Sequence, residues 1–219
     1  MELHFIFHTK QQILDGQPTT NRGYIVIRVF CAEFFAPSFL CNDPECYQSW
    51  INAYDTNEGD ATITILEGSN KYHADFATQF NKTEWDDWCI LNDEELDWYI
   101  NVKKCRKVNI TCHAGSMVLW NSRTIHAGTE PEKTRDKPNF RCVVYLCYTP
   151  RTKASQSILA KKINAWKNLR MSTHWAHKAT LFPTTPRTWG NPLPNINPIV
   201  HPTINDLGYR LIGYETKPT

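Results

Sequence analysis

Short runs of apolar and β-branched residues, separated by turn sequences, make up most of this chain. Such runs at residues 24–30, 46–54, 61–66, 107–111, 117–120 and 141–148 each predict a strand. In the run at 46–54, Tyr47, Trp50 and Tyr54 also have helical spacing, so a helix is the alternative there. The run at 61–66 is closed by a Gly-Ser-Asn turn sequence at 68–70.

Three other segments have the spacing of helices. Residues 73–80 and 93–102 predict two short helices, and Asn92 or Asp93 can cap the second, whose first turn is acidic. Residues 155–168 predict an amphipathic helix whose apolar stripe contacts the core. That stripe consists of Leu159, Ile163 and Trp166, and Lys161 and Lys162 lie mostly off it.

Many short strands with helices grouped beside them predict a mainly β barrel or sandwich with helical cover. A chain of 219 residues fits one domain, which we place at residues 1–182. Residues 183–219 hold seven of the 13 prolines, and this density predicts a tail without regular helix or sheet. We expect the tail to wrap the domain as extended chain or to be mobile, and it is a candidate site for a protein partner.

Charge and composition limit the kinds of partner and the cellular compartment that we expect for this protein. The formal net charge of +2 gives no reason to expect a nucleic-acid or membrane-surface protein. The longest apolar runs fall short of the about 20 residues that span a bilayer, and the start MELHFIFHTK does not resemble a signal peptide. The eight cysteines therefore predict reduced thiols in an intracellular, cytoplasmic protein.

The main candidate functional residues lie between residues 115 and 151. A strand-like run at 117–120 leads through a polar corner to His126, and after a charged loop a second strand opens with Arg141. The loop itself, EPEKTRDK at 130–137, mixes charges of both signs and most simply predicts a solvated connection.

Four segments together resemble the phytanoyl-CoA dioxygenase-like branch of the iron(II)/2-oxoglutarate oxygenases, over residues 34–190. They are CYQSWINAYDTNEGDATITILEGSNKYHADF, GSMVLWNSRTIHAG, NFRCVVYLCYTPR and HWAHKATLFPTTPRTWG. The resemblance implies a double-stranded β-helix, or jelly-roll, core. It also implies an Fe(II) site made of a His-x-Asp pair and a distal His, with three open positions for 2-oxoglutarate and dioxygen.

Carried over by that resemblance, the distal His is His126, and the Arg that binds the far carboxylate of 2-oxoglutarate is Arg141. A planar guanidinium fork suits a carboxylate better than an ammonium group does. Gln48 stands where relatives turn a polar side chain into the pocket, and Arg123 matches the corner before the ligand. Asn121 replaces the more common Asp of that corner.

The upstream ligand pair departs from the family pattern. The gapless register puts Phe34 where the first His belongs and Ala36 where the Asp belongs, and neither side chain can bind iron. An alternative His-x-Asp pair, His73 and Asp75, falls in a predicted helix, where the side chains of residues two apart point in different directions. Glu33 is a further, unorthodox source of a carboxylate.

Three hypotheses follow from these residues. In the first, the iron site is degenerate and the protein is a non-catalytic binding, structural or assembly protein. In the second, it is an active 2-oxoglutarate-dependent dioxygenase that holds Fe(II) with His126 and non-standard ligands such as His73, Asp75 or Glu33. In the third, the protein binds a small dicarboxylate at Arg141 without metal.

Overall fold

The computed structural model describes residues 7–10, 35–37, 46–82, 88–135, 137, 139–172, 175–182, 184, 200–216 and 218. For residues 7–10, 35–37 and 88 it describes the backbone alone. The predicted strand at 24–30 lies outside these residues. No helix in the described part of the chain is long and apolar enough to cross a membrane.

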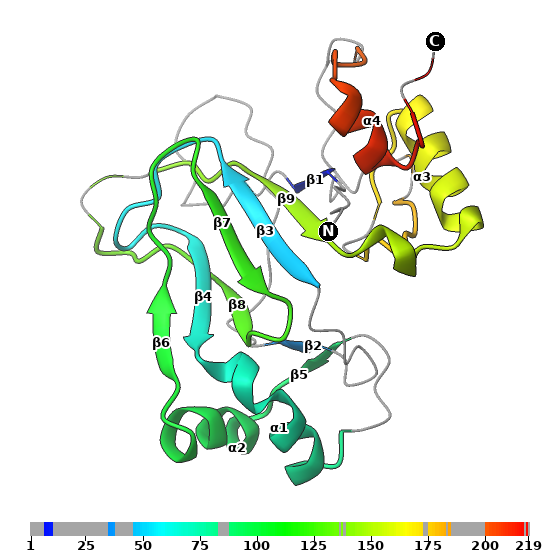
Figure 1. Cartoon of the computed structure of the whole chain (residues 1–219). Coiled ribbons are helices and arrows are strands. Elements are labelled where there is room, and N and C mark those ends of the chain that lie inside the picture. The colour runs from blue at the N-terminus through cyan, green and yellow to red at the C-terminus, as the bar shows by residue number, and fades with distance from the viewer. Residues whose placement is uncertain are drawn as a thin grey trace. The chain divides into compact units, whose positions relative to one another are not determined.

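Within the described residues, nine strands form two sheets (Figure 1). The four-stranded sheet has the order β1-β9-β3-β7 and the five-stranded sheet the order β5-β2-β8-β4-β6. The strands are β1 Phe7–Lys10, β2 Phe35–Pro37, β3 Tyr47–Asn52, β4 Thr62–Glu67, β5 Trp88–Ile90, β6 Arg106–Asn109, β7 Met117–Asn121, β8 His126–Thr129 and β9 Val143–Tyr148.

This strand order is that of a jelly roll. From β6 onward, consecutive strands alternate between the two sheets, and strands far apart in sequence, such as β3 and β9, lie side by side. The four described pairings in the five-stranded sheet are all antiparallel. The predicted double-stranded β-helix is therefore confirmed.

Several predicted strands have the expected places and differ only at their ends. The ambiguous run at 46–54 is a strand, β3, and not a helix, and 61–66 corresponds to β4. The strand expected to open with Arg141 begins at Val143 instead. The carbonyl of Cys142 accepts the Ala53 backbone N–H at 2.9 Å, so this pairing starts ahead of the regular strand.

A group of helices packs at one end of the five-stranded sheet and provides the predicted helical cover. It consists of the 3₁₀ turn Ser69–Tyr72, α1 His73–Gln79, α2 Asp93–Asp97 and the π-helical turn Trp98–Val102. Figure 1 shows α1 and α2 together at one end of β4 and β6. The buried core of this group contains Leu66, Phe76, Cys89, Leu91, Tyr99, Cys105, Ile125 and Ala127.

The predicted cap of α2 is Asn92. Its side-chain oxygen accepts the Glu95 backbone N–H at 2.9 Å, and the Glu95 carboxylate accepts the Asn92 backbone N–H at 2.9 Å. This reciprocal pair is a capping box. Glu95 is buried, and Lys82 neutralises it at 2.9 Å.

The chain divides into two compact units, residues 1–10, 45–49 and 144–219, and residues 11–44 and 50–143. The first unit contains the 3₁₀ turn Arg151–Lys153, α3 Gln156–Lys167 and α4 Asp206–Ile212. Helix α3 confirms the predicted amphipathic helix, and Ser155 caps it. The predicted domain boundary at residue 183 stays a prediction.

Two expectations for this unit were wrong. The tail was predicted to lack helix, but α4 forms because no proline interrupts residues 203–217 and Asn205 caps the first turn. Lys162 was placed off the apolar stripe of α3, yet it is 5% exposed, and its amino group donates to the Leu211 carbonyl of α4 at 3.2 Å. Since α4 packs beside α3, a second helix surface covers this lysine.

Candidate functional site

His126 is placed by a tight corner between β7 and β8. The Asn121 side chain accepts the Arg123 backbone N–H at 2.9 Å, and the Asn121 carbonyl accepts the Thr124 N–H at 2.9 Å. The Ile125 N–H then donates to the Ser69 hydroxyl at 2.9 Å. Asn121 thus forms the turn itself, a role that needs a side-chain oxygen and no negative charge.

The His126 ring has a defined tautomer. Its Nδ1 lies 2.8 Å from the Thr124 carbonyl, which can only accept a hydrogen bond. The hydrogen of the neutral ring is therefore on Nδ1, and the lone pair is on Nε2. Metal-binding histidines commonly have their second nitrogen held by a carbonyl in this way.

Arg141 and His126 lie at the two ends of a pair of tryptophans. The guanidinium carbon of Arg141 is 4.7 Å from the centre of the Trp50 ring. Trp50 meets Trp120 edge-on with ring centres 6.0 Å apart, and Trp120 meets the His126 ring at 5.5 Å. Trp50 is fully buried and Trp120 is 8% exposed, so this row of four side chains has a rigid centre.

Neither tryptophan was predicted as part of the site. The available signal was their position, because Trp50 ends the Gln-Ser-Trp segment and Trp120 begins the Trp-Asn-Ser-Arg corner. Strand periodicity indicated two strands there, but it could not show that the two rings meet. Stacking on the indole face leaves the N–H donors of a guanidinium in its own plane, where a carboxylate binds them best.

Ala36, one of the two residues of the predicted ligand slot, lies on β2, the strand next to that of His126. On β2, Phe35 is directly opposite His126, and Ala36 is opposite Cys89 of β5. Phe34 and Glu33 lie outside the described residues. Among the residues that the structure describes, no group of three or more His, Cys, Asp or Glu could hold a metal ion. The described residues therefore do not supply the iron triad, and the assignment of the slot to Phe34 and Ala36 stays a prediction.

The alternative pair at His73 and Asp75 is helical, as expected. His73 opens α1 and is buried, whereas Asp75 is exposed and pairs with Lys103 at 3.0 Å. Two residues apart on a helix, the two side chains leave the axis in different directions. This arrangement commits the Asp75 carboxylate to a surface ion pair.

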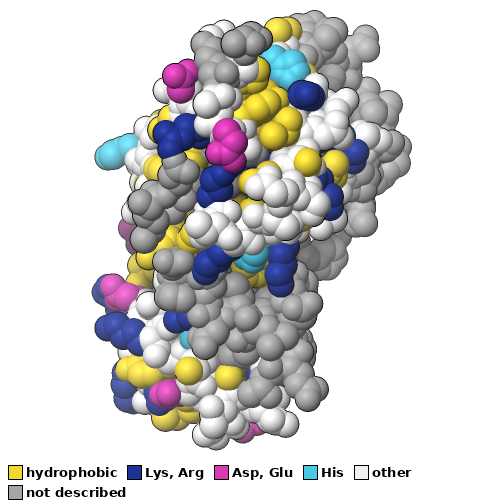
Figure 2. Space-filling view, turned by 45° about the vertical axis from the view of Figure 1, so that its right-hand side comes forward, with side chains coloured by type: hydrophobic (Ala, Val, Ile, Leu, Met, Phe, Trp, Pro, Cys, Tyr) yellow, Lys and Arg dark blue, Asp and Glu magenta, His cyan; other side chains and the backbone are white. Residues whose placement is uncertain are grey.

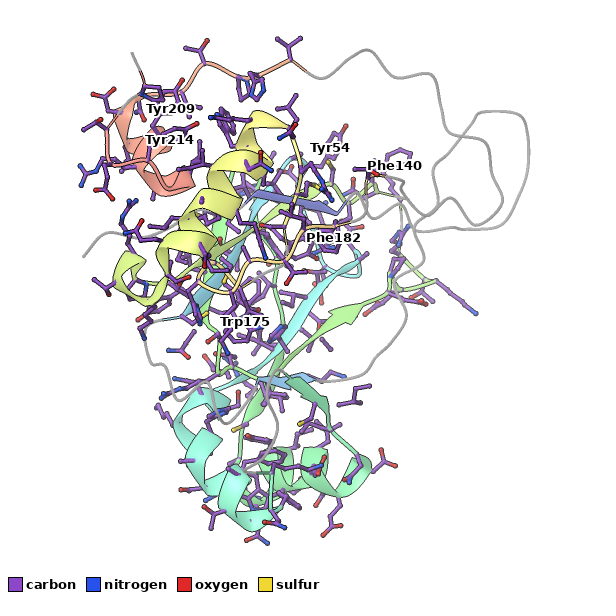
Figure 3. All side chains as sticks on the ribbon, turned by 90° about the vertical axis from the view of Figure 1, so that its right-hand side faces the viewer. Tyr54, Phe140, Trp175, Phe182, Tyr209 and Tyr214 are labelled. Atoms are coloured by element: carbon purple, nitrogen blue, oxygen red, sulfur yellow. The ribbon has the colours of Figure 1, made fainter. Side chains whose placement is uncertain are left out.

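The other predicted binding residues have less defined roles. Gln48 is half-buried on β3 and belongs to the first compact unit, whereas His126 and Arg141 belong to the second. Arg123 is half-buried in the corner before His126. The exposed rings of Tyr54 and Phe140, just after β3 and before β9, are shown in Figure 3.

The charged loop at 130–137 is not simply solvated. The Glu132 N–H donates to the Gly59 carbonyl at 2.8 Å, and the buried Asp60 carboxylate accepts from the Asn139 amide at 2.8 Å. Arg135 lies 4.0 Å from the other Asp60 oxygen. These contacts tie the segment before Arg141 to the loop at 55–60.

The distribution of charge on the surface bears on the expected partners. On the face shown in Figure 2, Lys and Arg side chains lie at several separate places, with acidic and apolar side chains between them. The expectations of no nucleic-acid partner and of a small dicarboxylate ligand stay predictions.

No protein-family model matches the sequence, and no curated protein matches it. Among solved structures, EctD from S. alaskensis with bound Fe is similar with a TM-score of 0.44 and 12% identity, over 71% of this chain and 47% of that chain. The non-heme alpha ketoglutarate dependent epimerase SnoN from nogalamycin biosynthesis is similar with a TM-score of 0.32 and 16% identity, over 54% of this chain and 38% of that chain. This chain thus covers less than half of either protein, and likeness at this level assigns neither a family nor a function.

Proposed function

We propose that this protein is a non-catalytic binding protein that takes a small dicarboxylate at Arg141. The observation that carries the proposal is the row Arg141, Trp50, Trp120 and His126, which holds a cation and an imidazole on a buried aromatic pair. The 2-oxoglutarate implied by the sequence resemblance is a ligand of this class.

The aromatic support explains how Arg141 would act. A guanidinium over an indole loses little freedom on binding, because the ring already holds its plane. Its fork can then make two parallel hydrogen bonds to one carboxylate. Burial of Trp50 reduces the local dielectric, which strengthens a charge-assisted pair of this kind.

The lack of metal-binding atoms in the predicted ligand slot supports a site without metal. Fe(II) in oxygenases of this type needs two His and one carboxylate. Ala36 carries a methyl group and Phe34 a hydrocarbon ring, so neither provides a donor atom. A single imidazole ligand binds Fe(II) too weakly to retain it, since affinity comes from several ligands acting together.

Thermal unfolding with and without 2-oxoglutarate, in the presence of a chelator, tests the proposal. We expect the dicarboxylate to raise the melting temperature and Arg141→Ala to abolish the rise. Arg106→Ala is the matched control, because Arg106 is exposed and pairs with Glu67 at 2.8 Å. A rise that survives Arg141→Ala, or no rise in the folded parent protein, contradicts the proposal.

One observation favours an active oxygenase as the second candidate. The Nδ1 hydrogen bond of His126 leaves the lone pair on Nε2, the state that binds a metal. Anaerobic titration with Fe(II) and 2-oxoglutarate, followed by the weak charge-transfer absorption, separates the two functions. Tight Fe(II) binding that His126→Ala abolishes would establish this second candidate and exclude the first.

A further inference from the structure

Two cysteines in the first compact unit lie in direct contact although 101 residues separate them. The sulfur atoms of Cys46 and Cys147 are 3.8 Å apart. Cys46 stands immediately before β3, and Cys147 is on the neighbouring strand β9. Both side chains are 0% exposed, so each sulfur is held by its surroundings.

We propose that Cys46 and Cys147 are a redox modification site, which a hydroperoxide converts into a reversible disulfide. A disulfide requires the sulfur atoms to approach to about 2.05 Å with β-carbons about 3.5–4.5 Å apart. The two sulfur atoms are already 3.8 Å apart, so bond formation needs an approach of about 1.7 Å, which side-chain rotation with a slight backbone shift can supply.

A buried amine stands within electrostatic range of this pair. Cys147 interacts electrostatically with Lys162 of α3, and this interaction favours the charged form of the lysine. An amine beside a cysteine speeds the reaction of the thiol because it favours loss of the thiol proton. We assign the attack to Cys147, the thiol near this amine, and the resolving step to Cys46.

The chemistry balances with the hydroperoxide as sole oxidant. The Cys147 thiolate attacks one peroxide oxygen, the O–O bond breaks, and a sulfenic acid and hydroxide form. The Cys46 sulfur then attacks the sulfenic sulfur, the S–O bond breaks, and the released hydroxide takes up the Cys46 proton as water. With hydrogen peroxide, two thiols lose two electrons and two protons in all, and two waters leave.

The cross-link would close a loop that contains residues 47–146, and hence both His126 and Arg141. A link across so long a loop restricts the unfolded chain strongly. We expect the oxidised protein to melt higher, by on the order of 10 °C for a loop of about 100 residues.

Peptide mapping of the folded full-length protein after treatment with hydrogen peroxide tests the site. We expect the number of free thiols to fall by two and one linked peptide pair to contain Cys46 and Cys147. Dithiothreitol should restore both thiols. Linkage of Cys46 to another cysteine such as Cys41, or a 46–147 link that forms only in denaturant, would overturn the proposal.

Three variants sharpen the result. Cys147→Ala should abolish the linked pair and the rise in melting temperature, whereas Cys105→Ala, which removes a buried thiol outside the pair, should change neither. Lys162→Met, which removes this amine, should slow the oxidation several-fold, on the order of threefold to tenfold. An unchanged rate in Lys162→Met contradicts the proposed activation. If Cys147→Ala fails to fold, peptide mapping of the parent protein still decides the proposal, because that measurement needs no variant.

Discussion

Phe35 of β2 lies directly opposite His126 of β8, and Ile65 of β4 lies opposite the same histidine on its other side. In the register of the sheet, His126 therefore has Phe35 and Ile65 as its partners on the two neighbouring strands. Phe34 and Ala36 stand one residue to either side of Phe35. The residues of β2 itself, Phe35 to Pro37, have side chains without metal-binding atoms.

The register makes a prediction about an engineered metal site. Because facing residues on adjacent strands bring their β-carbons within about 5.5 Å, Phe35→His should create a two-histidine site with His126. We expect this variant to bind Zn²⁺ measurably in isothermal titration calorimetry and the parent protein not to.

A second variant tests the assignment that the sequence resemblance implies. Residues 34 and 36 alternate with residue 35 along a strand, so Phe34→His with Ala36→Asp probes the other register. If that double variant binds Fe(II) through His126 while a folded Phe35→His variant binds no metal, β2 is shifted by one residue from the register described above.

Lys162 should make stability depend on pH. Burial first, and then the nearby Arg151, lower the pKa of Lys162 from 10.5 to about 7. Between pH 7 and 10.5 the unfolded chain therefore binds more protons than the folded one, and the free energy of unfolding rises with pH across this interval. We expect a slope of roughly 1 kcal/mol per pH unit near pH 8 from this group, and no slope from it well below pH 7.

The measurement is urea unfolding at several pH values, compared between the parent protein and Lys162→Met. The difference between the two isolates Lys162 from the cysteines and tyrosines that titrate in the same range. Lys161→Met, a change at the exposed neighbour on α3, should keep the parent slope. Equal slopes in the parent and Lys162→Met would show that the amine stays charged in the folded protein.

Arg151 should hold the last turn of α4 in place. Its guanidinium donates to the carbonyls of Arg210 and Gly213 at 3.1 Å each and to the carbonyl of Tyr214 at 3.3 Å. The last carbonyls of a helix have no partner within the helix and carry partial negative charge, so a fork of this kind satisfies and neutralises them. We expect Arg151→Met to destabilise the protein by about 2 kcal/mol.

Hydrogen exchange across residues 206–214 reports this effect most directly. Exchange should accelerate in Arg151→Met and stay unchanged in Lys153→Met, a substitution at an exposed residue of the same 3₁₀ turn. Figure 3 labels Tyr209 and Tyr214, whose rings pack 5.6 Å apart at this helix end and should loosen together. Unaltered exchange in Arg151→Met would mean that packing against α3 alone retains α4.

The capping box of α2 predicts a smaller and local effect. Asn92→Ala removes the acceptor for the Glu95 N–H and should cost about 1 kcal/mol of stability. Asn92→Ser should recover most of it, since a hydroxyl also accepts from the third helical residue. Asn101→Ala is the control at an exposed position, and urea unfolding gives the comparison. A parent-like free energy of unfolding in Asn92→Ala contradicts the cap.

The sequence pattern correctly predicted those helices and strands that depend on interactions between near neighbours in the chain. The strand at 61–66 and the helix at 155–168 follow from alternation, from apolar spacing at three and four residues, and from the Ser155 cap. The helix at Asp206–Ile212 was missed because the count of prolines over the whole tail concealed a proline-free stretch with its own cap. Burial of Lys162 was missed because the helix that covers it lies 44 residues further along the chain.

For the candidate site, sequence motifs located His126 and Arg141 and indicated that both belong to a jelly roll. Which groups stand beside them depends on strand pairing across long stretches of chain, and a pattern of neighbours along the sequence does not record it. Only the tertiary structure brought Trp50 and Trp120 between the two residues, and only strand register set Phe35 opposite His126. The sequence determined which elements form because hydrogen bonding and side-chain alternation act between near neighbours. The fold decided the site because burial and cross-strand contact join residues that the chain itself keeps apart.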